Sequence, residues 1–329
     1  MQAQLIALDW GTTSLRAYKL AADGQILDVR ALPSGIMQLP QIPRLIRGEL
    51  CTDGFELAFE GACGDWLDAQ PELPVIACGM VGSAQGWREA AYCDTPANVA
   101  NLGAAIQTVR SRRGVDVHIV PGVIQRSRLP NVMRGEETQV LGALASVTTD
   151  DMLIGLPGSH SKWVQVADGC IVQFDTFMTG EVFAVLSEHS ILGRTQQRGG
   201  DFDAVAFDHG VQVALSVEGE AGLLSTVFSA RSLGLTGELS ASAQPDYLSG
   251  LMIGHELSAL AKAQRQRRNS DHLPAILLIG NGQLCIRYSR ALQACGFTHV
   301  SVAEQATERG LWQLALAAGL VHSSVVHSS

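Results

Sequence analysis

The sequence predicts an α/β protein made of two copies of one lobe, and three observations support this. First, 47% of the 329 residues are hydrophobic and only 5% are aromatic, a mix that suits helices packed closely on sheets. Second, one series of strands and turns occurs twice, close to half the chain length apart. Third, alternating helices and short apolar strands follow each copy. At about 100–200 residues per domain, the length also fits two domains.

The first copy spans residues 4–32. Residues 4–9 form an apolar run that ends in Asp9, and residues 10–14 supply a turn. LRAYKL then alternates its side chains between two faces, and an Asp-Gly pair at residues 23–24 turns the chain into a third strand. Three short strands joined by tight turns, one of them Asp-Gly, predict an antiparallel meander.

The second copy spans residues 152–176 and has the same order: MLIGL, the turn PGSHS, KWVQVA, an Asp-Gly pair and CIVQFDT. Gly11 and Gly158 occupy matching positions, 147 residues apart. A recurrence in fixed order indicates an internal repeat, although two unrelated hairpins with common turn chemistry would give a similar pattern. We expect an N-terminal lobe over residues 1–134 and a C-terminal lobe over residues 135–329, with a cleft between them.

The remaining elements are predicted from apolar periodicity and turn residues. The predicted helices cover residues 53–68, 98–112, 180–190, 202–215, 220–233, 245–268, 283–295 and 303–320. The predicted strands cover residues 73–80, 115–123, 274–280 and 298–303. No low-complexity segment separates the lobes, so we expect them to pack against each other rather than to be tethered.

Charge and cysteine usage restrict the class of partner. Lys and Arg total 23 against 32 Asp and Glu, a formal charge of −9, whereas a face for duplex nucleic acid needs dense positive charge. The seven cysteines are scattered without a C-x-x-C motif, which indicates reduced thiols. No apolar run reaches about 18 residues. We expect a cytoplasmic protein that binds a small molecule and neither nucleic acid nor membrane; a homodimer is one state that the sequence leaves open.

Both predicted hairpins begin with a turn rich in glycine and hydroxyl groups, a chemistry that binds phosphate. The first turn follows Asp9, whose carboxylate is placed to hold a water of Mg²⁺. The predicted phosphate ligands are Gly11, Thr12, Thr13 and Ser14 in the first turn and Gly158, Ser159 and His160 in the second. Ordinary turn capping would explain either turn alone, whereas two turns at matching positions favour a pair of sites that bracket a triphosphate.

This arrangement resembles the actin-like ATPase superfamily of sugar kinases, actin and heat-shock chaperones, whose two lobes are duplicated ribonuclease-H-like folds and whose hairpins grip ATP. Gly280, Asn281 and Gly282 follow an apolar strand and are similar to the adenosine motif of that superfamily, although many members have glycine in place of Asn281. ATP and Mg²⁺ are the cofactors that the resemblance implies. The first strand is followed by no G-x-G-x-x-G, which argues against a dehydrogenase.

Six segments narrow the resemblance: IALDWGTTSLRAY, SGIMQL, CGMVGSAQGWREAAY, NVMRGEETQVLGAL, LPGSHSKWV and DTFMTGEVFAVL. Together they resemble the 2-dehydro-3-deoxygalactonokinase family over nearly the whole chain. Membership implies ATP-dependent phosphorylation of the 6-hydroxyl of 2-dehydro-3-deoxy-D-galactonate, in D-galactonate catabolism. Two alternatives stay open: a kinase for another 2-keto-3-deoxy sugar acid, and a non-catalytic nucleotide-binding sensor of the same fold.

Phosphoryl transfer to a hydroxyl needs a carboxylate that orients the acceptor or accepts its proton. Glu136 and Glu137 follow Gly135 just before a helical run, a position similar to that of the catalytic Asp in glycerol-kinase-type sugar kinases. We expect Glu136 to be the base, with Glu137 as the second candidate. The alternative is that both glutamates only favour a helix N-terminus through its dipole.

The sugar acid that the resemblance implies needs a cation in its pocket, and a planar Arg fork suits a carboxylate best. Arg88 and Glu89 stand at a place similar to the Arg-Glu pair that holds the polyol in glycerol kinase. The predicted substrate residues are Ser83, Arg88, Glu89, Arg134 and Lys162. The alternatives are a surface pair between Arg88 and Glu89, an Arg134 that caps a loop, and a solvent-facing Lys162 at the start of a strand.

Overall fold

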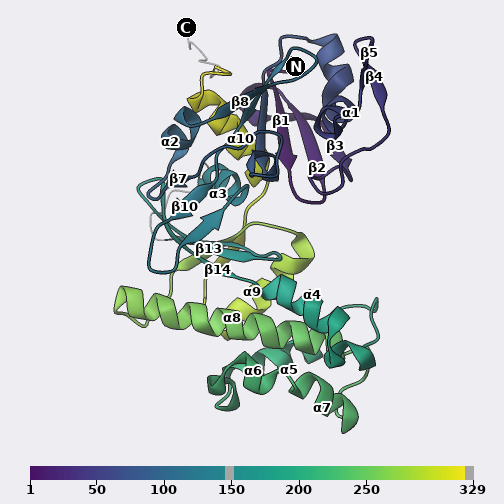
Figure 1. Cartoon of the computed structure of the whole chain (residues 1–329). Helices are drawn as coiled ribbons and strands as arrows, with labels where there is room; N and C mark the ends of the chain where they lie inside the picture. The colour runs from purple at the N-terminus through teal and green to yellow at the C-terminus, as the bar shows by residue number, and fades with distance from the viewer. Residues whose placement is uncertain (145–151, 323–329) are drawn as a thin grey trace. The chain divides into compact units, whose positions relative to one another are not determined.

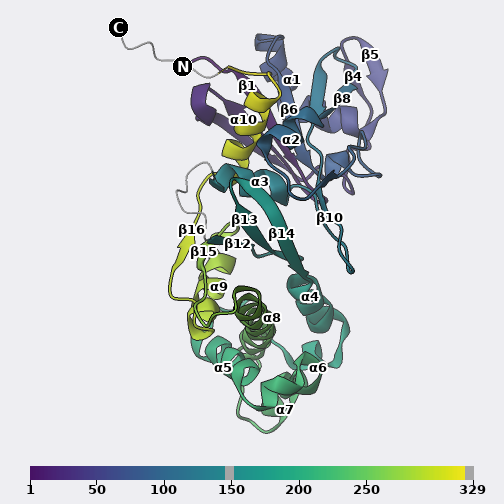
Figure 2. The same ribbon diagram turned by 90° about the vertical axis from the view of Figure 1, so that its left-hand side faces the viewer.

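A computed structural model describes residues 1–144 and 152–322 of the chain. The chain divides into two compact units, whose ribbon is drawn from two sides in Figures 1 and 2. Unit 1 consists of Met1–Asp150, Val166–Phe174 and Glu304–Ser329, and unit 2 consists of Asp151–Gln165 and Asp175–Ala303. The predicted lobe boundary after residue 134 stays a prediction.

Unit 1 is built on a six-stranded sheet with the order β3-β2-β1-β6-β9-β8. β1 (Leu5–Trp10), β2 (Leu15–Leu20) and β3 (Ile26–Leu32) form the predicted antiparallel meander. β6 (Val75–Gly79) and β9 (Asp116–Ile119) continue the sheet parallel to β1, and β8 (Gln107–Arg110) pairs antiparallel with β9. The short strands outside this sheet are β4 (Arg44–Ile46), β5 (Glu49–Cys51), β7 (Cys93–Asp94), β10 (Val123–Gln125) and β11 (Asn131–Met133).

The second sheet repeats this topology, with the order β14-β13-β12-β15-β16. Its strands are β12 (Met152–Leu156), β13 (Ser161–Ala167), β14 (Cys170–Phe177), β15 (Ala275–Leu278) and β16 (Val300–Val302). As in the first sheet, the three strands of the meander lie side by side, and two further strands, β15 and β16, continue the sheet parallel to the first strand of the meander. The predicted α/β class and the predicted duplication are confirmed.

The two hairpins also share their turn chemistry. Asp23 and Gly24 have φ values of 59° and 76°, and Asp168 and Gly169 have values of 50° and 70°. A two-residue hairpin turn in which both central residues have positive φ matches the twist of the flanking strands, and Asp-Gly adopts it readily. The same dipeptide therefore adopts the same pair of positive φ values in both copies, within a connection of residues 21–25 in the first and residues 168–169 in the second.

Ten helices lie in the described residues. Unit 1 contains α1 (Gly54–Ala69), α2 (Val99–Ala104), α3 (Glu136–Leu144) and α10 (Ala306–Ala317). Unit 2 contains α4 (Thr179–His189), α5 (Ala204–Leu215), α6 (Leu223–Thr226), α7 (Ser229–Leu235), α8 (Gln244–Arg268) and α9 (Gly282–Ala294).

Two helix predictions are wrong in part. The helix predicted over residues 98–112 ends at Ala104, because residues 107–110 form β8 and pair with β9. The β-branched pair Thr108 and Val109 suits such a ladder. The helix predicted over residues 220–233 is divided, because Gly222 has a φ of 90° and separates a short 3₁₀ turn from α6.

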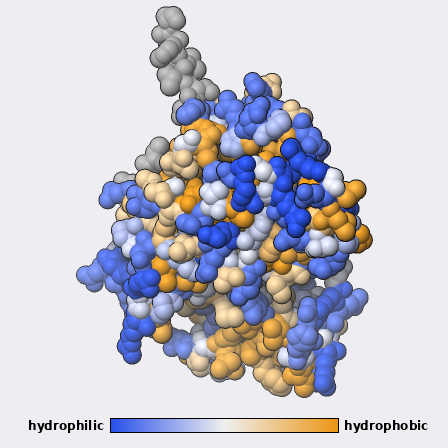
Figure 3. Space-filling view, turned by 45° about the horizontal axis from the view of Figure 1, so that its top comes forward, coloured by the Kyte–Doolittle hydropathy of each residue, from blue (hydrophilic) through white to orange (hydrophobic). Residues whose placement is uncertain are grey.

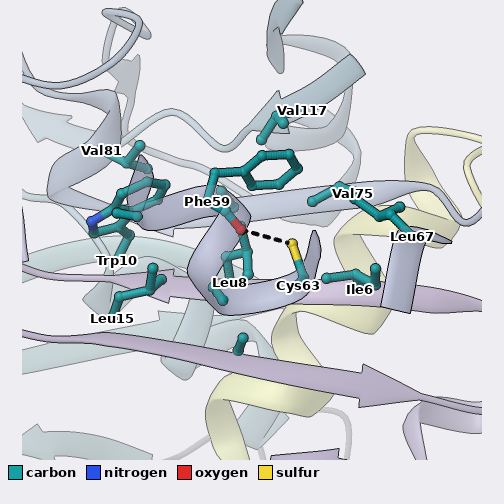
Figure 4. Packing of buried hydrophobic residues seen from close by; sticks show 14 of the residues in the cluster. Ile6, Leu8, Trp10, Leu15, Phe59, Cys63, Leu67, Val75, Val81 and Val117 are labelled. Atoms are coloured by element: carbon teal, nitrogen blue, oxygen red, sulfur yellow. Dashed lines mark hydrogen bonds between the residues drawn. The ribbon is translucent and has the colours of Figure 1, made fainter. Parts of the chain in front are cut away.

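The core of unit 1 lies between the sheet and α1. Leu8, Trp10 and Phe59 are among its fully buried side chains. Figure 4 shows them in one cluster with Cys63, whose thiol donates to the Phe59 carbonyl. This packing fixes β1, and with it the turn that follows Trp10.

Glycines let α10 approach α3 closely. A Cβ added to Gly142 would stand 1.9 Å from the Ala306 carbonyl oxygen, and one added to Gly310 would stand 1.9 Å from the Thr138 carbonyl oxygen. Figures 1 and 2 both show the yellow α10 beside the teal α3. α10 thereby helps to position α3, the helix that carries Glu136.

On the face drawn in Figure 3, hydrophilic and hydrophobic residues are interspersed. Among residues 1–144 and 152–322, no helix has the length and apolar character needed to cross a bilayer.

Candidate active site

The turn between β1 and β2 presents backbone N–H groups at its surface. The Gly11 N–H donates to the Ser14 carbonyl at 2.9 Å, and the carbonyls of residues 11 and 12 accept from the amides of residues 36 and 37 at 3.1 and 3.0 Å. Among the described residues, no backbone carbonyl accepts from the amides of Thr12, Thr13 or Ser14, which are exposed. Free amides beside three hydroxyls form a concavity suited to an anion.

Asp9 lies at the end of β1, directly before this turn, and its surroundings fit a cation. Burial raises the pKa of Asp9, and the charges of Glu308 and Glu136 raise it further, while Arg16 opposes them. A cation would stabilise the ionised carboxylate that these neighbours disfavour. The described residues contain no group of three or more His, Cys, Asp or Glu that could hold a metal, so Mg²⁺ here would take most of its ligands from water and phosphate.

The two glutamates at the start of α3 have different environments. Glu137 is fully buried and accepts the Gly135 N–H with both oxygens, at 2.9 and 2.7 Å, and the Thr138 hydroxyl at 3.2 Å. Burial, and then the charge of Glu136, raises the pKa of Glu137 to about 7. Glu136 is half-buried and accepts the Arg134 N–H at 3.0 Å. Of the two carboxylates, Glu136 is the partly exposed one, whereas Glu137 is enclosed at the start of α3.

Ser83, Arg88 and Glu89 lie on one loop that follows β6. Trp87 anchors this loop, since its ring stacks on Phe55 and lies edge-on to Trp10, with centroid distances of 6.2 and 5.9 Å. Arg88 and Glu89 are exposed, and no ion pair found between described residues includes either of them. The described part of the chain therefore does not contain the surface ion pair between Arg88 and Glu89 that was the alternative interpretation.

Arg134 packs against the same loop. Its Nη2 donates to the Ala90 carbonyl at 2.8 Å, and its guanidinium lies 4.3 Å from the Tyr92 ring centroid. Its Nε and Nη1, like the hydroxyl of the buried Ser83, have no partner among the described residues. A Cβ added to Gly82 would stand 3.0 Å from Nη1, which places the guanidinium beside the residue before Ser83. Unpaired buried polar groups of this kind mark a place for a ligand's polar atoms.

In unit 2, the turn between β12 and β13 is held by the start of α4. The Gly158 N–H donates to Ser161 Oγ at 3.4 Å, and the Ser159 carbonyl accepts the Glu181 N–H at 3.0 Å. A Cβ added to Gly180 would stand 2.4 Å from the Gly158 carbonyl oxygen, so a glycine is required there. His160 hydrogen-bonds to Glu181 through Nε2. The side chain of His160 is thus engaged by α4.

A buried hydrogen-bond network supports this turn from below. Ser161 Oγ and the Tyr288 hydroxyl lie 2.9 Å apart, and Tyr288 donates to Glu256 Oε2 at 2.8 Å. Trp163 Nε1 donates to the other carboxylate oxygen of Glu256 at 2.7 Å. Burial raises the pKa of Glu256, and its hydrogen bonds act in the opposite direction. The network ties the turn to α8 and α9.

Lys162 is buried beside the second turn. Its exposed fraction is 6%, and its Nζ donates to Thr176 Oγ1 at 2.9 Å. The alternative in which Lys162 faces solvent is therefore wrong.

The predicted adenosine motif lies where β15 leads into α9. Gly280 has a φ of 152°. Asn281 caps α9, since its side chain accepts from the amides of Gln283 and Leu284 at 2.9 and 3.4 Å. The Asn that replaces the usual glycine is thus accounted for by helix capping.

The second turn and α9 line one cavity of about 390 Å³, which we call the α4–α8–α9 cavity. Gly158, Ser159, Thr179 and Gly180 line it beside the turn, and Leu284, Arg287 and Tyr288 line it from α9. Cavities of this size hold cofactors, and a few polar groups among apolar walls are typical of them.

Comparison with known proteins agrees with this geometry. The sequence profile described as 2-keto-3-deoxy-galactonokinase matches residues 9–314. The chain belongs to this family. It is 35% identical over 308 residues to the probable 2-dehydro-3-deoxygalactonokinase of Rhizobium meliloti (strain 1021), covering 93% of this chain and 94% of the relative. It is 33% identical over 321 residues to the 2-dehydro-3-deoxygalactonokinase of Escherichia coli (strain K12), covering 96% and 98%.

Structural comparison places the chain in the same 2-keto-3-deoxy-galactonokinase family. A solved Sinorhizobium meliloti structure that carries the 2-dehydro-3-deoxygalactonokinase name superposes with a TM-score of 0.80, at 32% identity, covering 95% of this chain and 98% of that one. The family and the fold expected from the sequence motifs are therefore confirmed, and the protein is expected to use ATP as a kinase of this family does.

Within this member of the 2-keto-3-deoxy-galactonokinase family, the structure groups the predicted site residues in two sets. Unit 1 brings Asp9, the first turn, the Ser83–Glu89 loop and residues 134–137 together, and unit 2 brings the second turn beside α9. Sequence reasoning assigned no role to Thr179, Asp246, Glu256, Arg287 or Tyr288, which line the cavity or support the second turn. The one available signal was the DTFMTGEVF segment, since Gly180 in it packs against the second turn and Thr179 lines the same cavity.

Proposed function

We propose that the protein transfers the γ-phosphoryl group of ATP to the 6-hydroxyl of 2-dehydro-3-deoxy-D-galactonate, as a step of D-galactonate catabolism. The enzyme name of its Escherichia coli relative supports this proposal. Of the structural observations, the one that carries it is the half-buried Glu136 carboxylate, close enough to Asp9 at the first turn to affect its pKa. A protein that only sensed nucleotide would have no use for a carboxylate accessible to an acceptor hydroxyl.

The nucleotide roles follow the two turns. Thr12, Thr13 and Ser14 would bind phosphate oxygens through free amides and hydroxyls. Gly11, whose N–H is bonded to the Ser14 carbonyl, would let a phosphate approach the backbone, and Gly158 and Ser159 would bind phosphate in unit 2. The α4–α8–α9 cavity would take the ribose beside the second turn, with Gly280, Asn281 and Gly282 at the start of α9. Asp9 would hold Mg²⁺ through its water, and the metal would supply charge neutralisation of the phosphates. His160 is bonded to Glu181, which makes it the weakest of the proposed phosphate ligands.

Glu136 would accept the proton of the 6-hydroxyl as its oxygen bonds to the γ-phosphorus and the bond to the ADP oxygen breaks. Glu137 is the second candidate base, but its two contacts with the Gly135 N–H and its complete burial favour a role in holding α3.

The acidic end of the substrate needs positive charge. Arg88 is exposed, and Arg134 has unpaired N–H groups beside Ser83, so these residues would bind the carboxylate and neighbouring oxygens. Glu89 would accept from a substrate hydroxyl. Lys162 would add positive charge beside the second turn. We also infer a cytoplasmic enzyme, which the seven free thiols support.

The deciding experiment is ADP release from MgATP with 2-dehydro-3-deoxygalactonate, beside the gluconate epimer and a reaction without acceptor. Turnover mainly with the galactonate form supports the proposal, and equal turnover with both epimers would favour a broader 2-keto-3-deoxy sugar acid kinase. Nucleotide binding with no acceptor-dependent ADP release would contradict kinase activity and favour a non-catalytic nucleotide-binding sensor.

The matched variant pair for the base is Glu136→Gln and Glu137→Gln. Glu136→Gln should lower kcat by about 10²–10⁴-fold, the usual contribution of a general base, with nucleotide binding retained. If Glu137→Gln lowers kcat more than Glu136→Gln does, while both variants unfold cooperatively, the assignment of the base is reversed.

A further inference from the structure

Unit 2 contains a second cavity that adjoins the first. It measures about 300 Å³, and Ser187, Gln196 and Arg198 are among its lining residues. The α4–α8–α9 cavity and this second cavity are both lined by Phe183, Pro245, Asp246 and Arg287. Only the first cavity is lined by Gly158 and Ser159. A ligand with its phosphates at this turn can therefore extend past Arg287 into the second cavity.

The planar guanidinium of Arg287 is held in a fixed orientation where the two cavities adjoin. One oxygen of Asp246 accepts from Arg287 Nη1 at 2.6 Å, and the other accepts the Asp203 N–H at 2.8 Å. The guanidinium carbon of Arg287 lies 4.2 Å from the ring centroid of Phe202. Pairing at one edge and stacking on one face fix the guanidinium plane, while a quarter of the side chain stays exposed. A planar guanidinium in this state is a surface on which an aromatic ring can stack.

The second cavity also holds an unpaired amide. The side-chain oxygen and nitrogen of Gln196 are both buried without a partner among the described residues, as is the Ser187 hydroxyl. Leaving such groups unpaired is costly, so a ligand that pairs them gains affinity. A carboxamide offers one acceptor beside one donor, which complements the edge of adenine, where an amino group stands beside a ring nitrogen.

The charges around the second cavity favour a neutral ring over a phosphate. Glu188, Asp201 and Asp246 line it together with Arg198 and Arg287. Arg198 is itself engaged, because it donates to the Ser187 carbonyl and lies 3.8 Å from Glu188. No excess of positive charge is left for an anion.

We propose that the base of the bound nucleotide stacks on Arg287 and is recognised at its amino-bearing edge by the Gln196 amide. This inference rests on the proposed function, which requires a bound nucleotide. It adds the residues that determine specificity for adenine. The phosphates lie at Gly158 and Ser159, and the ribose occupies the cavity between this turn and Arg287.

The test is calorimetric binding of MgADP and of the Mg complex of purine riboside 5′-diphosphate, which lacks the amino group. The unmodified protein should bind ADP about tenfold more tightly than the analogue. Gln196→Met, which keeps the length of the side chain, should reduce this preference to less than twofold, because the amino group loses its acceptor.

The stacking role is tested by Arg287→Lys, which retains the charge but not the plane. Its affinity for both nucleotides should fall about fivefold, with the preference for ADP retained. The control is Arg290→Lys, on the same helix, where an exposed arginine pairs with Asp208; it should bind like the unmodified protein. Thermal unfolding of each variant checks the fold, and if Arg287→Lys does not fold, the Gln196→Met comparison decides.

The inference is overturned if Gln196→Met keeps the full preference for ADP, or if a folded Arg287→Lys binds as Arg290→Lys does. These outcomes leave kinase activity untouched. A different result would refute the proposed function and not this inference: nucleotide binding that depends on Gln196, with no ADP release that depends on the acceptor.

Discussion

Glu137 is an acid whose protonation is coupled to folding. Its pKa rises from 4.5 to about 7 because it is buried beside Glu136, so between these pH values the folded chain binds a proton that the unfolded chain lacks. The stability associated with protonated Glu137 is fully present below pH 4.5 and is lost as the pH rises through 7. Glu137→Gln should remove this loss.

Urea unfolding at pH 5, 6, 7 and 8 measures the effect. The free energy of unfolding of Glu137→Gln, minus that of the unmodified protein, should grow with pH by as much as about 3 kcal/mol, at 1.36 kcal/mol per pKa unit. A difference that stays constant across this pH range would contradict the prediction.

The ionised Asp9 carboxylate lowers the stability of the fold but is needed at the proposed metal site. Its pKa is raised by burial and by the charges of Glu308 and Glu136, so its ionised form costs folding free energy at neutral pH. Asp9→Asn should therefore raise the Tm of the protein without nucleotide, while kcat falls by at least about 100-fold because the metal loses its anchoring charge. Calorimetry without ligand and ADP release at saturating Mg²⁺ provide the two readouts. A lower Tm together with unchanged activity would remove Asp9 from the metal site.

At the scale of elements, Gly158 and Gly180, which lie next to each other in space, allow the effects of substitution on stability and on ligand binding to be measured separately. A Cβ at Gly158 would have no atom within 4 Å, whereas a Cβ at Gly180 would stand 2.4 Å from the Gly158 carbonyl oxygen. Gly158→Ala should leave stability within about 0.5 kcal/mol and weaken ADP binding at least tenfold, because the methyl group occupies the space of a phosphate. Gly180→Ala should lower stability by about 1–3 kcal/mol through overpacking. Calorimetric titration and urea unfolding of both variants make the comparison, and equal ADP affinity for Gly158→Ala and the unmodified protein would remove Gly158 from the phosphate site.

The same scale explains which elements the sequence could predict. Both hairpins were predictable because their turns are local: Asp23-Gly24 and Asp168-Gly169 need only their own positive φ values. β8 was not, because its pairing with β9 is a tertiary interaction that overrides local periodicity. The site shows the same division, since glycine turns are visible in the sequence, while Gln196 and Arg287 come together only through the fold. Glu136 and Glu137 are neighbours of one type, and only burial distinguishes them.

For the whole molecule, the duplicated topology predicts that each of the two similar turns binds phosphate. MgADP should slow amide hydrogen exchange at residues 12–14, which are exposed, and at residues 158–161. Mass spectrometry of exchange with and without MgADP measures both segments in one experiment. Protection confined to residues 158–161 would show that the first turn does not bind phosphate.

The position of α10 determines the order in which the molecule can be completed during synthesis. α10 packs on α3 through Gly142 and Gly310 and also contacts β1, yet β1 is made long before α10. Unit 2 lies between them in the chain, so its sheet and helices emerge while the first sheet has α1 but not yet α10. The nascent chain must therefore keep an incomplete N-terminal core apart from other exposed apolar surfaces until α10 has been made.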